Sequence, residues 1–207
     1  MPGIRAVGRA RISAWLRHWG PLLPLLGATF IVMLGFGAVI PVLPLYVQDL
    51  GLDASTLGVI VAGWAIGRLI AEPPAGWWAD KHSRKPQMVL SLLIVGVTSV
   101  SMLVFTSAAA LFALRFIAGL ASGMLGPAAR GTLVDATDVG SRGQAFGYFA
   151  AFQMAGFVIG PAIGAFGSSI FGGFAFPFLF MGVLGLVSAV FLWRFQPDDS
   201  RVADPVH

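Results

Sequence analysis

The segment Gly76-Trp77-Trp78-Ala79-Asp80-Lys81-His82-Ser83-Arg84-Lys85 separates two long apolar runs, at about 55–78 and 87–105. Each run is close to the roughly 20 apolar residues that a helix needs to cross a bilayer. Charges gather in the connection between the runs and are rare inside them, as expected where charge in lipid is costly. The pattern therefore predicts two membrane-spanning helices joined by a short charged connection.

The same alternation of apolar runs and polar breaks continues through the chain. Only 11% of the residues are charged and 57% are hydrophobic, whereas soluble domains average about 25% charged residues. The sequence predicts an all-α, polytopic membrane bundle over 21–195, with a basic cytoplasmic arm at 1–20 and a polar cytoplasmic tail at 196–207. Its six predicted transmembrane helices lie at about 21–47, 55–78, 87–105, from the turn at 106–108 to 130, 143–166 and 174–193.

The basic residues predict the orientation of this bundle. Of the 13 lysines and arginines, only Arg68 and Arg115 fall inside predicted spans, and all others flank the same set of span ends. The opposite side carries only Asp49 and Asp53. Because basic connections stay in the cytoplasm, both termini are expected there, and the net charge of +4 does not indicate a nucleic-acid partner. Apolar residues spaced along 12–19 fit either a short interfacial helix or a mobile basic tail.

The quoted segment also carries a specific motif. It resembles the signature loop of the major facilitator superfamily, which reads Gly, three residues, Asp, basic, any residue, Gly, basic, basic. Ser83 stands where the family has the second glycine, and an ordinary basic loop would not explain Gly and Asp at this spacing. The resemblance implies a gating role at the cytoplasmic face for the matching residues, which are Gly76, Asp80, Lys81, Arg84 and Lys85. It also implies that Asp135 pairs with Arg84, the alternative being a solvated loop charge.

A second motif lies in the fifth predicted span. Its glycines let helix backbones approach closely, and its proline removes a backbone donor. The spacing resembles the family's antiporter motif, except that Ala165 replaces its last glycine, whereas the alternative is ordinary small-residue packing. The matching residues are Gly147, Gly156, Gly160, Pro161 and Gly164.

Three charged residues inside the spans are candidates for proton coupling. Arg115 resembles the arginine of the family's span-four motif; alternatively it extends to the outer membrane surface. Glu72 could carry a proton, because a low dielectric raises the pKa of a carboxyl group. Since Arg68 lies four residues earlier on the same helix face, Glu72 could instead neutralise it or meet cytoplasmic water.

Several classes of function are excluded or left without support by the composition. Cysteine is absent and the three histidines are dispersed, so no metal site is expected. No phosphate-binding loop or nucleophile arrangement appears, so we expect neither enzymatic activity nor a cofactor. Substrate-binding residues are not identified by the sequence.

Pro41-Val42-Leu43-Pro44 in the first span resembles the first helix of twelve-span drug:proton antiporters. The resemblance implies a bacterial inner-membrane protein that forms the N-terminal six-helix half of such a transporter, built from two inverted three-helix repeats. It would export a small drug-like, apolar or cationic molecule in exchange for protons. Its partners would be the bilayer and either a second six-helix half or a second copy in a homodimer. The alternative is a truncated, non-transporting protein or an assembly partner of a full transporter.

Overall fold

The computed structural model describes residues 19–197, and every regular element in that range is helical. All of the predicted interfacial helix at 12–19 except Trp19, and most of the arm and tail, lie outside the described residues. The elements are η1 (Gly20–Leu22), α2 (Leu23–Val39), α3 (Val42–Asp49), α4 (Ala54–Lys81), α5 (Arg84–Ser101), α6 (Ala108–Asp135), α7 (Arg142–Phe171) and α8 (Ala175–Phe195).

Five of the described helical segments are long and apolar enough to cross a membrane, where the sequence predicts six spans. The helix outside this set is α5, which begins with Arg84 and Lys85 and buries several polar residues along its length. The first predicted span is divided between α2 and α3. Pro41 lies at this break, where a residue without a backbone N–H cannot continue the hydrogen-bond ladder.

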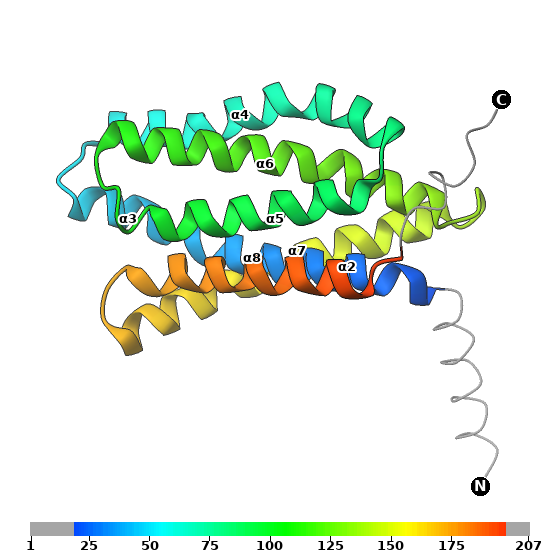
Figure 1. Cartoon of the computed structure of the whole chain (residues 1–207). Coiled ribbons are helices and arrows are strands. Elements are labelled where there is room, and N and C mark those ends of the chain that lie inside the picture. The colour runs from blue at the N-terminus through cyan, green and yellow to red at the C-terminus, as the bar shows by residue number, and fades with distance from the viewer. Residues whose placement is uncertain (1–18, 198–207) are drawn as a thin grey trace, which may run out of the picture.

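The helices pack in an order that is symmetric about its centre. Contacts run from α4 to α6, α5, α8, α2 and finally α7, and Figure 1 shows α4, α6 and α5 as one group beside α8, α2 and α7. Exchanging α2 with α6, α4 with α7 and α5 with α8 gives the same order read from the other end, so each helix keeps equivalent neighbours. Such an order is expected of two three-helix repeats, with α2 and α3 together forming the first helix of the first repeat.

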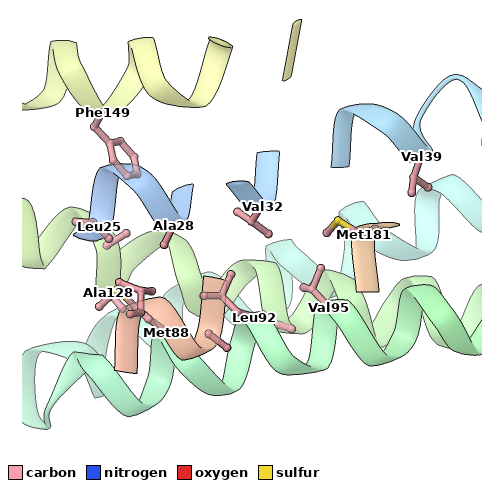
Figure 2. Packing of buried hydrophobic residues seen from close by; sticks show 14 of the residues in the cluster. Leu25, Ala28, Val32, Val39, Met88, Leu92, Val95, Ala128, Phe149 and Met181 are labelled. Atoms are coloured by element: carbon pink, nitrogen blue, oxygen red, sulfur yellow. The ribbon is translucent and has the colours of Figure 1, made fainter. Parts of the chain in front are cut away.

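The hydrophobic core lies where α2, α5, α6 and α8 meet (Figure 2). Leu25, Ala28 and Val32 of α2 belong to it together with Met88 and Leu92 of α5. By contrast, α4 and α7 lie at the two ends of the packing order and leave many large apolar side chains exposed. Exposed apolar side chains are normal for helices whose outer faces meet lipid or another helical bundle.

The connections separate charges between the two ends of the bundle. The α4–α5 and α6–α7 connections lie at the end where the chain enters and leaves the bundle, and the other three turns lie at the opposite end (Figure 1). The first end carries Lys81, Arg84 and Arg142, and the opposite end carries Asp49 and Asp53. The structure thus reproduces the separation of charges that the sequence predicts.

Two connections between helices are shorter in the structure than the sequence predicts. The segment Gly76–Lys81 belongs to α4, so only His82 and Ser83 separate α4 from α5. The connection before the last span is predicted to open at 167–169 and to end by 173, but α7 continues to Phe171. The turn occupies only the last part of that connection, at Gly172 and Gly173, whose φ angles of 65° and 103° favour glycine.

Candidate functional site

A cavity of about 660 Å³ lies between α2, α4, α6 and α7. This volume falls within the range of about 300–1,000 Å³ that is usual for small-molecule sites. Its polar wall includes Arg68, Arg130, Ser122 and Gln153. Its aromatic lining comprises Phe36, Trp64, Phe146, Phe149 and Phe157. The cavity therefore combines an apolar surface with a few charged groups, as binding sites for organic molecules do.

Arg68, Glu72 and Arg130 form one charged cluster at this cavity. Arg68 donates from Nε and Nη2 to Glu72 Oε1 at 3.2 and 3.1 Å. Nη2 of Arg130 lies 3.8 Å from the same oxygen. Both arginines line the cavity, whereas Glu72 lies beside them and is not part of its wall. The structure thus pairs Glu72 with Arg68, as one sequence-based alternative expected, and adds a second arginine.

Close packing of α4 against α6 brings these residues together. A Cβ atom at Gly123 would lie only 2.8 Å from the backbone oxygen of Arg68 and from the Cβ of Ala71. The guanidinium of Arg130 lies over Gly126, where a Cβ would be 3.2 Å from Nη1. Glycine at these two positions therefore sets the helix separation and leaves space for the guanidinium.

Trp64 anchors the α4 side of the cavity. Its indole Nε1 donates to Ser122 Oγ at 3.3 Å across the α4–α6 contact. The guanidinium carbon of Arg68 lies 5.5 Å from the centre of the indole ring, within the range of a cation–π interaction. Arg68 is thus held between an aromatic face and a carboxylate.

Arg115 lies apart from this cluster. It is only 9% exposed and lines a second cavity of about 30 Å³, together with Thr98, Ser99 and Ser122. This burial contradicts the alternative in which Arg115 extends to the outer surface. Its Nε has no hydrogen-bond partner among the described residues, but the cavity has room for a water molecule, since one needs about 10–15 Å³.

Arg84 of the signature segment connects helix ends at the charged end of the bundle. Its side chain is 4% exposed, donates from Nε to the backbone oxygen of Ala79 at 3.0 Å and forms an ion pair with Asp135. The structure thus contains the pairing that the resemblance implies. Asp80 lies 3.9 Å from Arg84, but its side chain is 77% exposed, so this ion pair is more open to water than the pair with Asp135.

The other residues of this motif are less constrained. A Cβ at Gly76 would lie 3.9 Å from Pro127, an ordinary contact, so Gly76 does not mediate a close helix approach here. The ammonium groups of Lys81 and Lys85 lie 4.2 and 5.5 Å from the rings of Trp77 and Trp193, respectively. Both ammonium groups therefore lie within cation–π range of aromatic rings at the charged end.

The glycines of the α7 motif divide into two groups. A Cβ atom at Gly160 would lie 2.8 Å from the backbone nitrogen of Ala38, and one at Gly164 would lie 2.6 Å from its backbone oxygen. Gly156 contacts α2 in the same way, and Pro161 packs near Gly37. A Cβ at Gly147, by contrast, would meet nothing within 4 Å. Four of the five motif residues thus form the α2–α7 contact beside the cavity.

Arg130 was not predicted as a site residue from the sequence, where it belongs only to the charged span ends. One feature of the sequence could have indicated its position. Gly126 lies four residues before Arg130, so the two residues occupy one face of α6. Gly131 was not predicted from the sequence either. A Cβ there would lie 2.5 Å from Nε of Arg84. Recognising either residue requires knowing that α6 packs on both α4 and α5.

Comparisons with known proteins agree on one family. The sequence profile of the Major Facilitator Superfamily matches residues 25–206. Quinolone resistance protein NorA of Staphylococcus aureus is 35% identical over 161 residues, which cover 78% of this chain and 41% of that protein. Multidrug resistance protein 2 of Bacillus subtilis is 34% identical over 166 residues, covering 80% and 41%. The chain thus spans less than half the length of these curated relatives.

Solved structures show the same fold at lower sequence identity. A bacterial homologue of the human lysosomal transporter Spinster, in an inward-facing and unoccupied conformation, superposes with a TM-score of 0.74 at 19% identity. The match covers 87% of this chain and 43% of that one. The human organic anion transporter MFSD10 gives a TM-score of 0.72 at 19% identity, covering 86% and 47%.

Proposed function

Because the chain belongs to the Major Facilitator Superfamily, we propose that it acts as one half of an alternating-access transporter that exports a small, drug-like molecule in exchange for protons. The names of its relatives, which refer to quinolone and multidrug resistance, suggest drug-like substrates. In alternating access, two helical bundles rock against each other around a central site. The second bundle would be another six-helix half or a second copy of this chain.

The cavity between α2, α4, α6 and α7 carries this proposal. It has the size of a small-molecule site, and its walls come from helices of both three-helix repeats. Its neighbours α4 and α7 present long, exposed apolar faces against which a second bundle could pack. The cavity therefore offers a binding surface, and the exposed faces of α4 and α7 offer an area where a second half could pack and enclose the substrate.

The charged residues supply candidates for the coupling step. Glu72 is held by Arg68 and Arg130, and protonation would weaken both contacts and change the charge at the cavity wall. Arg115 is a fixed positive charge buried between that wall and α5. We propose that these groups link proton binding to the rearrangement of α4 against α6.

We also propose that both termini lie in the cytoplasm. The chain is an integral membrane protein, and we expect it in the bacterial inner membrane with the basic end of the bundle inside. The signature residues Gly76, Asp80, Lys81, Arg84, Lys85 and Asp135 would then control opening at the cytoplasmic face. Asp80 is exposed there and could contact a helix of the second bundle.

Flux in reconstituted vesicles tests the proposal. The purified chain is placed in proteoliposomes at increasing protein density, and uptake of a fluorescent quinolone is followed after a pH gradient, acidic inside, is imposed. We expect uptake that collapses when a protonophore is added. If two copies form the transporter, the rate at low density rises with the square of the protein density.

Matched variants separate coupling from assembly. Arg115→Ala and Glu72→Gln should abolish gradient-driven uptake while leaving the oligomeric state unchanged, whereas Arg194→Ala and Asp138→Asn, at exposed positions away from the cavity, should retain it. Unchanged uptake in Arg115→Ala would remove its coupling role. Absence of uptake at every density would reject transport by self-pairing and favour the non-transporting alternative.

A further inference from the structure

We propose that the cavity between α2, α4, α6 and α7 binds organic anions, namely an apolar or aromatic body that carries a carboxylate or a comparable anionic group. This inference rests on the proposed function, because it names the substrate class of the same site. It differs from the apolar or cationic compound that the sequence suggests. Its basis is the pair of arginines, Arg68 and Arg130, in the cavity wall.

The cluster carries more positive than negative charge. Two guanidinium groups share a single carboxylate, and three contacts from them end on the same atom, Oε1 of Glu72. Among the described residues that line the cavity, the two arginines are the only charged ones. An entering molecule therefore meets positive charge, while the compensating carboxylate of Glu72 lies beside the wall.

The arginines also retain donors that an anion could use. A guanidinium has five N–H donors in a planar fork. Arg68 directs Nε and Nη2 to Glu72, and Arg130 approaches Glu72 only at 3.8 Å. Because a carboxylate accepts paired hydrogen bonds from such a fork, an organic carboxylate could bind between the two side chains with little rearrangement.

The rest of the cavity suits an apolar body. Phe36, Phe149 and Phe157 contribute aromatic surface from α2 and α7, whereas the arginines belong to α4 and α6. Trp64 already stacks under Arg68 and fixes its position. A flat aromatic ring could thus pack on these side chains while its anionic group reaches the guanidinium pair.

A cationic molecule would bind poorly in the same place. It would have to approach two guanidinium groups, and the carboxylate that could attract it is already engaged by both. Like charges brought together in a partly desolvated site disfavour binding. The arrangement therefore selects against the lipophilic cations that an acidic cavity would favour.

Equilibrium dialysis with charge-matched probes tests the proposal. The full chain is placed in nanodiscs of phosphatidylcholine at pH 7, and its affinities for 2-naphthoate, 2-naphthylmethylammonium and neutral 2-naphthylmethanol are compared. The three share a ring system and differ in charge. We expect 2-naphthoate to bind about tenfold tighter than either of the others, as for one charge-assisted hydrogen-bonded contact.

Three variants make the test specific to the cluster. Arg130→Gln should weaken 2-naphthoate about tenfold and leave 2-naphthylmethanol unchanged. Glu72→Gln should tighten 2-naphthoate, because both guanidinium groups lose their internal partner. Arg194→Gln, the same change on an exposed arginine of α8 outside the cavity, should have no effect on any probe.

Three results would overturn the anion site: tighter binding of the ammonium probe, 2-naphthoate affinity that is unchanged in a folded Arg130→Gln protein, or no saturable binding of any probe. The measurement uses no proton gradient, so it is independent of export. Binding of 2-naphthoate without gradient-driven flux would reject export and support the anion site. Gradient-driven flux of other compounds without 2-naphthoate binding would reject the anion site and support export.

Discussion

The guanidinium of Arg84, at the first residue of α5, is buried against the carboxylate of Asp135, at the last residue of α6, 51 residues further along the chain. The same guanidinium donates to the backbone oxygen of Ala79 near the end of α4. One side chain therefore joins the ends of three helices. This contact fixes the charged end of the bundle, where the signature motif lies.

Removing Arg84 should destabilise the bundle strongly. Arg84→Met removes the part-buried ion pair with Asp135 and the donor to the backbone oxygen of Ala79, and the loss of a hydrogen bond to a charged group typically costs about 1.5–3 kcal/mol. Thermal unfolding in detergent measures the effect. Lys81→Met, which removes a neighbouring exposed cation, should change the midpoint little, and an equal loss in both variants would contradict a specific role for Arg84.

Gly131 should be intolerant of even a small side chain. A Cβ there would lie 2.5 Å from Nε of Arg84, so Gly131→Ala displaces the guanidinium from its pocket. We expect a loss of about 1–3 kcal/mol, as for overpacking of a core, measured by the same unfolding assay. In the background of Arg84→Met most of this loss should disappear. A full loss in the double variant would show that the glycine acts independently of Arg84.

The α7 motif should respond to alanine at only some of its glycines. Gly164→Ala places a methyl group 2.6 Å from the backbone oxygen of Ala38, so it should separate α7 from α2 and lower stability by about 1–3 kcal/mol. Gly147→Ala meets open space and should not. If Gly147→Ala abolishes transport without affecting stability, that glycine acts in a contact outside the described chain.

The start of α4 should make a small contribution to stability that depends on pH. Asp53 caps this helix by accepting a hydrogen bond from the backbone N–H of Thr56 at 2.9 Å. Hydrogen bonding with the side chain of Thr56, followed by this backbone bond, lowers the pKa of Asp53 below its ordinary value of 3.8. A carboxyl with a lowered pKa stabilises the folded state above its ordinary pKa. The contribution is lost as the pH falls through the folded-state pKa.

Comparing unfolding midpoints at pH 7 and near pH 3 in the wild type and in Asp53→Ala measures this contribution. The wild type should be the more stable at pH 7, and the difference should shrink in acid. Asp138→Ala, at an exposed loop position, should give no such change. A difference that is constant between the two pH values would contradict the cap.

Much of the helical layout follows from the sequence, because apolar runs of membrane length are set by composition. Helix ends are less predictable. Residues 167–169 keep the backbone hydrogen bonds of α7, and the chain turns only where Gly172 and Gly173 adopt positive φ angles. The break at Pro41 follows from the missing N–H of proline. The weaker apolar character of α5 reflects Arg84 and Lys85 at its start, which belong to the signature motif.

The site was less predictable than the fold. The pair Arg68 and Glu72 follows from helical spacing alone, and Arg84 with Asp135 was implied by resemblance. The contribution of Arg130 depends instead on how closely α6 packs on α4, which backbone contacts at Gly123 determine. Likewise, whether Arg115 extends to the surface or stays buried depends on the helices around it. Such contacts between distant segments leave little trace in one sequence.

Proton movement driven by substrate tests the central claim most directly. Proteoliposomes that contain the chain and a pH-sensitive dye, with no initial pH gradient, are loaded with a quinolone and diluted into quinolone-free buffer. Exchange predicts that outward substrate flow draws protons inward, so the interior acidifies in the wild type and not in Glu72→Gln. Substrate efflux without a change in internal pH, or acidification that is equal in both proteins, would contradict the account.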